Sequence, residues 1–418
     1  MPADPTDARV TDPFRFDYES PVLRCGRDSA AGLADELAAH GLERALVVTG
    51  RTVGTTADVV NPVREGLGDR LAAVFAETTP EKRLATAAAG VAALRDVDAD
   101  CIVALGGGSS LDVAKQVSVL AARVRAAEAD GEAVEEVIAA AGREFQETGT
   151  LAVPDEGLVP IVAVPTTLAG ADVSHVAGMT ATPDNGLVTE PTSGGIADSG
   201  LMPVAVVADP TLVATTPDRV LAASAMNGFD KGIETLYAAT ATPVTDATAM
   251  RGLSLFREGL LAFGAGERDD WVFDALVRGC TLVQYGISRP DEGTLSVIHA
   301  FGHGLTRTYD VQQGAAHAVV APHVLRYLFE QCDARRDLLA RAFDVADAED
   351  AASAVVDAVA EVRDALDLPT RLRDVDGPER SAFPAVAEHV LADSFMSNAP
   401  PGLDPTPADI EDVLAAAW

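Results

Sequence analysis

Three consecutive glycines, Gly106, Gly107 and Gly108, stand where a buried-strand pattern ends and a helical pattern begins. Residues 101–105 form a short apolar run, and Ser109 opens an apolar repeat at helical spacing. The stretch therefore predicts a strand, a tight turn and a helix N-terminus. Glycine lets the backbone approach an anion closely, and the free N–H groups of a helix N-terminus stabilise phosphate charge. We interpret the turn as a diphosphate site in which Gly107 tolerates no side chain and can need positive φ. The alternative is a turn that binds nothing.

The first half of the sequence alternates between strand and helix patterns. Strand patterns lie at residues 44–49, 71–75, 101–105, 158–164 and 204–208, with helical patterns at 58–67 and 81–95 among them. Such alternation is typical of a doubly wound parallel sheet. Residues 14–22 also alternate enough to predict a strand or hairpin at the entrance to the fold.

Strand patterns disappear from residue 217 onward. Helical patterns follow at 218–237, 247–263, 271–285, 295–307, 317–329, 335–345, 351–366 and 408–418. The sequence thus predicts an α/β domain with a Rossmann-like parallel sheet over residues 1–212 and an all-helical domain over residues 213–418.

The composition narrows the environment and the partners. The net charge of −33 is spread along the whole chain, so the surface repels nucleic acid. Three lysines stand against 28 arginines, a balance that suggests a halophilic protein from a high-salt cytoplasm. Because lysine is so scarce, each remaining lysine is a candidate for a specific task.

No targeting, membrane or cysteine signal is recognisable. Apolar runs fall short of the ~18 residues that span a bilayer, and the first residues lack a basic segment followed by an apolar one. The four cysteines form no C-x-x-C pair, which argues against a disulfide framework or a zinc knuckle. We therefore expect a cytoplasmic protein without a membrane partner.

Two further loops follow strand patterns and complete the expected nucleotide site. After residues 44–49 come Gly50 and Arg51, which offer room and positive charge where an acid would select the ribose 2′-OH of NAD. We therefore expect NADP, with NAD as the alternative if Arg51 is an ordinary surface arginine. The segment after residues 158–164 is rich in small and hydroxyl-bearing residues, which suit contacts with ribose and nicotinamide. The candidate contacts within this segment are Thr166, Thr167 and Leu168.

Four of the seven histidines fall between His299 and His323. His299 and His303 are four residues apart on an expected helix, so they share a face. A histidine pair of this kind is more often structural than catalytic, and spacing alone does not decide between the two.

The stretch from Gly106 to Lys115 resembles the dinucleotide-binding signature of the iron-containing alcohol dehydrogenase family, which is related to glycerol dehydrogenase and dehydroquinate synthase. The resemblance covers nearly the whole chain. It implies a dinucleotide-binding first half, in which Ser109 and Asp112 join the glycines, and a helical half for substrate and catalysis. In metal-dependent members, the position of His299 binds metal and that of His303 is an active-site histidine. The other metal ligands stand where this chain has Asn227, Lys231 and Gln313.

Three of the four ligand positions are therefore altered. Neutral amides are poor ligands for a catalytic divalent ion, and an ammonium group cannot coordinate one. We infer a metal-free site. Maleylacetate reductases form a metal-independent branch of the family, and this chain resembles them at Asn227 and in the run from His317 to Val320. It departs from them at Lys231 and Gln313, so their substrate does not transfer.

Hydride transfer to a carbonyl needs positive charge near the oxygen, and a metal usually supplies it. We expect the Lys231 ammonium to supply it here, by stabilising an alkoxide or by binding a substrate carboxylate. His303 is the expected proton donor, while His299 and His317 orient substrate or complete a proton path beside Asn227. Alternative anchors for a substrate carboxylate are Arg289 and Arg307.

The leading interpretation is thus a metal-independent NAD(P)-dependent reductase of a small carbonyl compound that carries an anionic group. We expect it to form a homodimer or a larger homo-oligomer. A second interpretation is a metal-dependent enzyme that binds iron or zinc through shifted ligands, such as Asp230, Glu234, His299 and His303. A third is a nucleotide-binding protein that has lost catalysis. A lyase of the dehydroquinate synthase type shares the fold, but the sequence lacks a basic cluster for its phosphorylated substrate.

Overall fold

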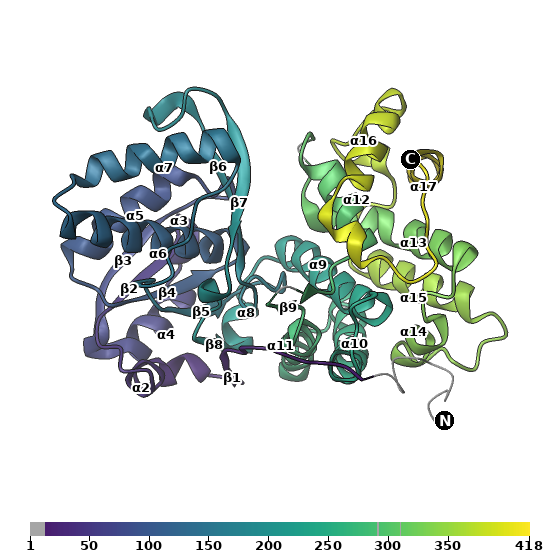
Figure 1. The fold of residues 1–418 in the computed structure, drawn as a ribbon. Helices are drawn as coiled ribbons and strands as arrows, with labels where there is room; N and C mark the ends of the chain where they lie inside the picture. Colours follow the sequence, from purple (N-terminus) through teal and green to yellow (C-terminus); the bar gives the residue numbers. More distant parts are fainter. Residues whose placement is uncertain (1–12, 291, 310) are drawn as a thin grey trace. The chain divides into compact units, whose positions relative to one another are not determined.

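The computed structural model describes residues 13–290, 292–309 and 311–418 (Figure 1). These residues form two compact units. One is Glu19–Thr216, and the other is Pro217–Trp418 together with the described residues before Glu19. Among the described helices, none combines the length and the apolar character needed to cross a membrane.

The first unit is built on a six-stranded sheet. Its strands are β1 (Val22–Cys25), β2 (Ala45–Gly50), β3 (Leu71–Thr78), β4 (Cys101–Gly106), β5 (Ile161–Pro165) and β8 (Ala205–Ala208). They lie in the order β1-β8-β5-β4-β2-β3, and every neighbouring pair is parallel. The inner strands β4, β5 and β8 are buried along their whole length, which explains their unbroken apolar sequence. The predicted parallel α/β sheet is confirmed.

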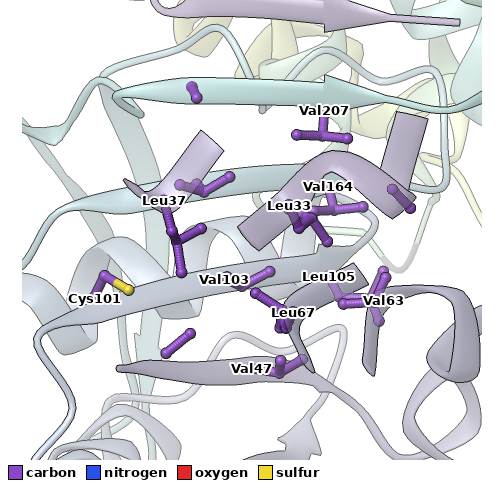
Figure 2. Packing of buried hydrophobic residues seen from close by; sticks show 14 of the residues in the cluster. Leu33, Leu37, Val47, Val63, Leu67, Cys101, Val103, Leu105, Val164 and Val207 are labelled. Carbon is purple, nitrogen blue, oxygen red and sulfur yellow. The ribbon is translucent and has the colours of Figure 1, made fainter. Parts of the chain in front are cut away.

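Helices pack on both faces of this sheet. The helices of the first unit are α2 (Leu33–Ala39), α3 (Arg51–Thr55), α4 (Ala57–Leu67), α5 (Leu84–Asp96), α6 (Gly108–Ala129), α7 (Val134–Thr148) and α8 (Pro210–Val213). On one face, Leu37 of α2 and Leu67 of α4 pack against Val103 and Val164 of the inner strands (Figure 2). This fully buried cluster holds the helices in place and so fixes the strand ends from which the loops emerge.

One local difference from the sequence prediction stands out in this unit. From residue 13 onward, regular structure begins at Val22, so the strand predicted at residues 14–22 is wrong for residues 14–21. A short helical turn, Pro183–Asn185, lies between β6 (Val176–Ala181) and the antiparallel β7 (Thr192–Ala197).

The second unit is mainly helical, as predicted. Its helices are α9 (Asp218–Tyr237), α10 (Pro243–Gly264), α11 (Asp270–Gln284), α12 (Val297–Thr306), α13 (Gln313–Gln331), α14 (Arg336–Ala342), α15 (Ala351–Ala365), α16 (Phe383–Leu391) and α17 (Pro407–Ala417). The sequence patterns missed α16, which is short, and a small antiparallel pair, β9 (Ser288–Arg289) with β10 (Glu292–Gly293).

Candidate active site

Three of the loops singled out in the sequence lie side by side at one edge of the sheet. β4 is the neighbour of both β2 and β5, with Thr49 opposite Leu105 and Gly106 opposite Pro165. The N–H of Thr166 donates to the carbonyl oxygen of Gly106 at 3.0 Å, which joins two of the loops directly. Because parallel strands end together, the sheet collects the residues after β2, β4 and β5 at its carboxyl edge, where open α/β sheets bind ligands.

The glycines of the turn have different tasks. Gly106 has φ +134°, a conformation that residues with side chains rarely adopt. Gly107 has φ −84°, so the expectation of positive φ at Gly107 is wrong. Gly107 is instead a place of close approach, because a Cβ atom there would lie 3.1 Å from Cγ2 of Thr167. Gly108 leaves more room, with Ala171 as its nearest neighbour at 3.6 Å.

The helix after this turn starts without a side-chain cap. Within the described chain, no side chain accepts a hydrogen bond at the N-terminus of α6, whose N-cap is Gly107. By contrast, Thr242 and Thr406 form capping boxes at the starts of α10 and α17. The first N–H groups of a helix have no partner within it, and they carry its positive end. The 22-residue helix α6 therefore presents these donors at a half-buried turn, as a diphosphate site requires.

Asp112 and Lys115, in the first turns of α6, have structural partners. The Asp112 carboxylate pairs with Lys82 Nζ at 2.6 Å and accepts the N–H of Gly178 at 3.1 Å. Lys115 is fully buried and donates to the carbonyl oxygens of Ala171 and Val176 at 2.9 and 3.0 Å. Both residues tie the segment after β5 to α6. Contact between Asp112 and a cofactor stays a prediction.

The remaining predicted nucleotide-binding residues differ in accessibility. Arg51 is exposed and begins α3 directly after Gly50. Ser109 and Thr167 are half-buried, whereas the side chains of Thr166 and Leu168 are buried. Contact between these residues and a cofactor stays a prediction.

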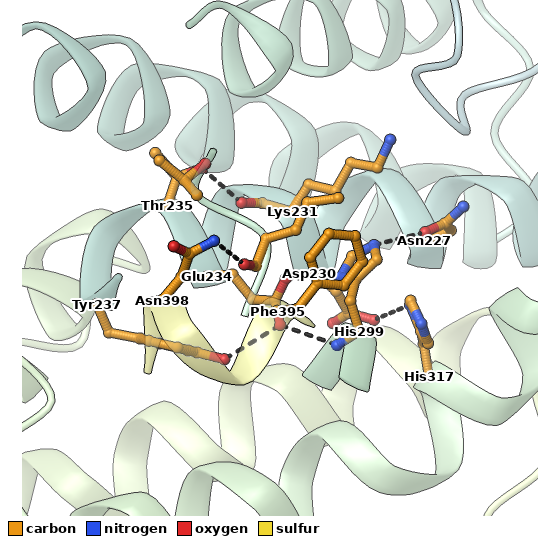
Figure 3. Close-up of polar contacts among 12 residues, drawn as sticks. Asn227, Asp230, Lys231, Glu234, Thr235, Tyr237, His299, His317, Phe395 and Asn398 are labelled. Carbon is orange, nitrogen blue, oxygen red and sulfur yellow. Dashed lines mark hydrogen bonds and ion pairs between the residues drawn. The ribbon is translucent and has the colours of Figure 1, made fainter. Parts of the chain in front are cut away.

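In the helical unit, α9, α12 and α13 bring the predicted catalytic side chains into one cluster (Figure 3). Asn227 of α9 and His299 of α12 are joined through Oδ1 and Nε2 at 3.1 Å. The other nitrogen of His299, Nδ1, lies 2.6 Å from Oε2 of Glu234, which is about two turns beyond Asn227 along α9. His317 of α13 packs its ring against His299 with centroids 4.4 Å apart. The predicted proximity of Asn227, His299 and His317 is therefore present.

Burial sets the protonation of this cluster. It raises the pKa of Glu234 to about 7, although hydrogen bonds from the N–H groups of His299 and Ser296 act in the opposite direction. It lowers the pKa of His317 to about 3 and that of His299 well below its ordinary value. Burial and the Glu234 charge also raise the pKa of Asp230 well above its ordinary value. Burial thus favours the uncharged forms of these side chains.

These protonation states assign the hydrogens of His299. An amide oxygen only accepts hydrogen bonds, so Nε2 donates to Asn227. When Glu234 is protonated, the neutral ring carries its lone pair on Nδ1, and this atom accepts the proton of Glu234. In that tautomer Nε2 of His299 has no lone pair to offer a metal ion.

A metal site is not assembled by the neighbouring groups either. Within residues 13–290, 292–309 and 311–418, no three His, Cys, Asp or Glu side chains are placed to hold a metal ion. Asp230 faces Nδ1 of His317 at 3.4 Å, and Glu234 also receives the Tyr237 hydroxyl at 3.3 Å. The described residues thus do not fit the metal that the resemblance suggests, nor the shifted set of Asp230, Glu234, His299 and His303.

Lys231 lies on the half-buried side of α9. Its charge is among the causes that lower the pKa values of His299 and His317, which places it close to both. Figure 3 shows its ammonium group pointing away from the buried carboxyls of Asp230 and Glu234. Lys231 is therefore the cation nearest to the Asn227–His299 pair among the cluster residues drawn there.

His303 stands at the end of the cluster with a different set of partners. Its Nδ1 lies 2.9 Å from Oδ2 of Asp393, and Arg307 donates to the same oxygen at 2.9 Å. The Phe395 ring lies against the imidazole with centroids 5.0 Å apart. Sequence reasoning missed Asp393 and Phe395. The available signal was the Asp-Ser pair at residues 393–394, which is typical of a cap.

Arg289, an alternative anchor for a substrate carboxylate, has partners of its own. Arg289 is buried, pairs with Glu292 at 2.9 Å and donates to the carbonyl oxygen of Thr240, so its guanidinium group is already engaged. A cavity of about 1060 Å³ in the helical unit is lined by residues near the starts of α9 and α13, including Arg219 and Gln312. The predicted catalytic residues do not line it.

Comparison with known proteins gives consistent matches. Residues 20–210 match the profile described as iron-containing alcohol dehydrogenase, and residues 221–418 match the C-terminal profile of the same family. Maleylacetate reductase 1 of Cupriavidus pinatubonensis is 26% identical over 93% of either chain. Lactaldehyde reductase of Escherichia coli K12 is 24% identical over 94% of this chain and 97% of its own. The crystal structure of sulfoacetaldehyde reductase from Bifidobacterium kashiwanohense in complex with NAD+ has a similar fold, with a TM-score of 0.80 at 20% identity, covering 97% of this chain and 99% of that one.

Proposed function

We propose that this chain, which belongs to the iron-containing alcohol dehydrogenase family and is therefore an oxidoreductase, reduces a small anionic carbonyl compound without a catalytic metal. The hydrogen bond between Asn227 and His299 carries the metal-free part of the proposal. It joins two positions that bind metal in other branches of the family, and it leaves Nε2 of His299 protonated. Gln313 and Lys231, at the remaining ligand positions, cannot compensate.

The chain's own residues divide the chemistry as follows. The Lys231 ammonium stabilises negative charge on the carbonyl oxygen or binds a carboxylate of the substrate. His303 delivers a proton to that oxygen, and Asn227 with His299 and His317 shapes a nearly uncharged floor beside it. A bound nicotinamide dinucleotide supplies the hydride in this family of reactions.

The residues that would hold that dinucleotide are in the α/β unit. Gly106, Gly107 and Gly108 with Ser109 offer main-chain donors at the start of α6. The family uses nicotinamide dinucleotides, and we propose NADP as the preferred form because Gly50 and Arg51 follow β2. We also propose a cytoplasmic location, where this dinucleotide is the common hydride donor.

Metal content and turnover measured together test the proposal. We expect purified protein with far less than one iron or zinc per chain to oxidise NADPH when given a suitable keto acid or aldehyde, and we expect chelators to leave the rate unchanged. Activity that disappears with a chelator and returns with iron or zinc would contradict the metal-free site. Tight NADPH binding without turnover on a broad panel would instead favour the catalytically inactive alternative.

A further inference from the structure

We propose that Asp393 is a positioning residue for His303, whose carboxylate holds the ring so that Nδ1 keeps a hydrogen and Nε2 is left for the substrate oxygen. The inference rests on the proposed function, in which His303 handles the proton of the reduction. Asp393 itself does not contact substrate in this arrangement. It acts through the imidazole.

The Asp393 carboxylate is fixed in place by its own contacts. Its side chain is 1% exposed although the ring it holds is 30% exposed. One oxygen, Oδ2, receives both His303 Nδ1 and Arg307. The other, Oδ1, accepts the N–H of Phe395 at 3.0 Å and caps the short helix Ser394–Asn398. With both oxygens engaged, the carboxylate cannot turn away from the ring.

The ionisation of Asp393 decides the direction of its bond to His303. Burial alone would raise the pKa of Asp393, but hydrogen bonds from His303 and Phe395 and the nearby positive charges outweigh it, and the net pKa is lowered. An ionised carboxylate only accepts hydrogen bonds. His303 Nδ1 must therefore be the donor, and in the neutral ring the lone pair is on Nε2.

The surroundings of His303 add further constraints. Phe395 covers one ring face, tilted by 33° from the imidazole plane, so rotation of the ring is restricted. On its own helix α12, the charged or titratable neighbours are Arg307 and His299, and α9 and α13 contribute Lys231 and His317. Helix α16 meets α12 at Gly304 through Val386 and Val390, which are apolar. Asp393 is the negative group in direct contact with the ring.

The proton balance follows from this geometry. In the reduction, the carbonyl carbon gains a hydride from the reduced nicotinamide, and the carbonyl electron pair takes the Nε2 proton of the His303 imidazolium to form an O–H bond. The ring returns to its neutral form with Nδ1–H still donated to Asp393. A proton from water then restores the imidazolium, and the oxidation runs through the same steps in reverse.

The tautomer of His303 can be read directly in the protein. In full-length protein labelled with ¹⁵N-histidine, two-bond nitrogen–proton spectra distinguish Nδ1–H from Nε2–H rings, and His303→Gln assigns the signal. We expect Nδ1–H in the wild type. Asp393→Asn, which offers both a donor and an acceptor, should shift the ring towards Nε2–H. Arg307→Met is the matched control, since it removes the other partner of Oδ2 and should leave the tautomer unchanged.

Kinetics supply the second readout. We expect Asp393→Asn to lower kcat about 10- to 100-fold, a part of the roughly 10² to 10⁴ that general acid catalysis contributes, and to change the pH dependence of kcat. The KM for NADPH should stay within about twofold. Asp393→Glu should recover part of kcat. Asp350→Asn, an exposed cap of α15 in the same unit, should leave kcat unchanged.

The outcomes separate this inference from the proposed function. A wild-type Nε2–H ring, or an Asp393→Asn variant with wild-type tautomer and wild-type kcat, would overturn the positioning role. If Asp393→Asn does not fold, the wild-type tautomer and Asp393→Glu still decide the question. An Nδ1–H ring in a protein that reduces no carbonyl compound would support the positioning by Asp393 and refute the reductase assignment instead.

Discussion

Replacing Lys231 by methionine tests the charge on which the metal-free mechanism depends. Methionine keeps an unbranched apolar stem and removes the ammonium group. The substituted position lies on α9 within the electrostatic reach of His299 and His317, whose pKa values Lys231 lowers. The glycine turn that we propose as the diphosphate site belongs to the other unit, so we expect NADPH affinity to stay nearly intact while turnover falls.

The size of the effect follows from the half-buried position of the side chain. At an effective dielectric constant of about 20, two unit charges ~4 Å apart interact by ~4 kcal/mol. Removal of one preorganised donor at a developing oxyanion typically costs about 10²- to 10³-fold in kcat, or ~2.7 to 4 kcal/mol. Both approaches predict a fall in kcat of about two to three decades in Lys231→Met.

Steady-state reduction, followed at the NADPH absorbance band, measures this directly once a substrate is known. Lys231→Arg is the matched control because it keeps the charge, and we expect it to retain much more activity than Lys231→Met. Fluorescence titration with NADPH checks that cofactor binding survives. Near-normal kcat in Lys231→Met, or wild-type activity that requires added divalent metal, would refute the reasoning.

Three further predictions address the nucleotide site and the buried cluster. Gly107→Val should weaken NADPH binding, because even a Cβ atom at this position would lie 3.1 Å from Thr167 and the larger valine side chain would block the turn. Unchanged affinity by calorimetry would exclude this turn as the diphosphate site. Gly50→Asp with Arg51→Ala should shift the preference towards NAD by ~1.5 to 3 kcal/mol, measured as a ratio of kcat/KM values, and a wild type that already prefers NAD would contradict the assignment. Glu234→Gln should abolish a pH-dependent loss of stability between pH 4.5 and about 7. The folded Glu234 carboxyl keeps its proton up to about pH 7, so the free energy of unfolding of the wild type falls by up to ~1.4 kcal/mol per pH unit as pH rises through this window. Urea unfolding at pH 5 and pH 7 measures the change in the free energy of unfolding between these two pH values. An equal change in the wild type and in Glu234→Gln would count against the raised pKa.

Much of the fold follows from local pattern, whereas the strand order does not. Continuous apolar runs predict buried parallel strands, and β4 and β5 occur where these runs lie. The insertion of β8 between β1 and β5 depends on how long crossovers route around the sheet, for which the sequence carries no local signal. The same holds for α16, where nine residues give too little periodicity to recognise.

The candidate site was predictable along each helix and unpredictable across helices. The four-residue spacing of His299 and His303 predicted a shared face of one helix, and both residues lie on α12. Which residues contact each helix face is determined by the tertiary packing. Asp393 reaches His303 from 90 residues away in the sequence, and Glu234 meets His299 from 65 residues away. The burial that raises the pKa of Glu234 likewise arises from the packing of the helices.

The position of β1 at the edge of the sheet has a consequence for the order of folding. Its neighbour is β8, and the connection is reinforced by Asp209, which accepts the N–H groups of Asp28 and Ala30 across 181 and 179 residues of sequence. During synthesis, β2 to β5 emerge and can pair while β1 still waits for its partner. Contacts between such distant segments form slowly, and an unpaired strand is open to association with other chains in the meantime. β1 therefore docks on the sheet only after β8 has been synthesised, although β1 itself precedes β2 to β5 in the chain.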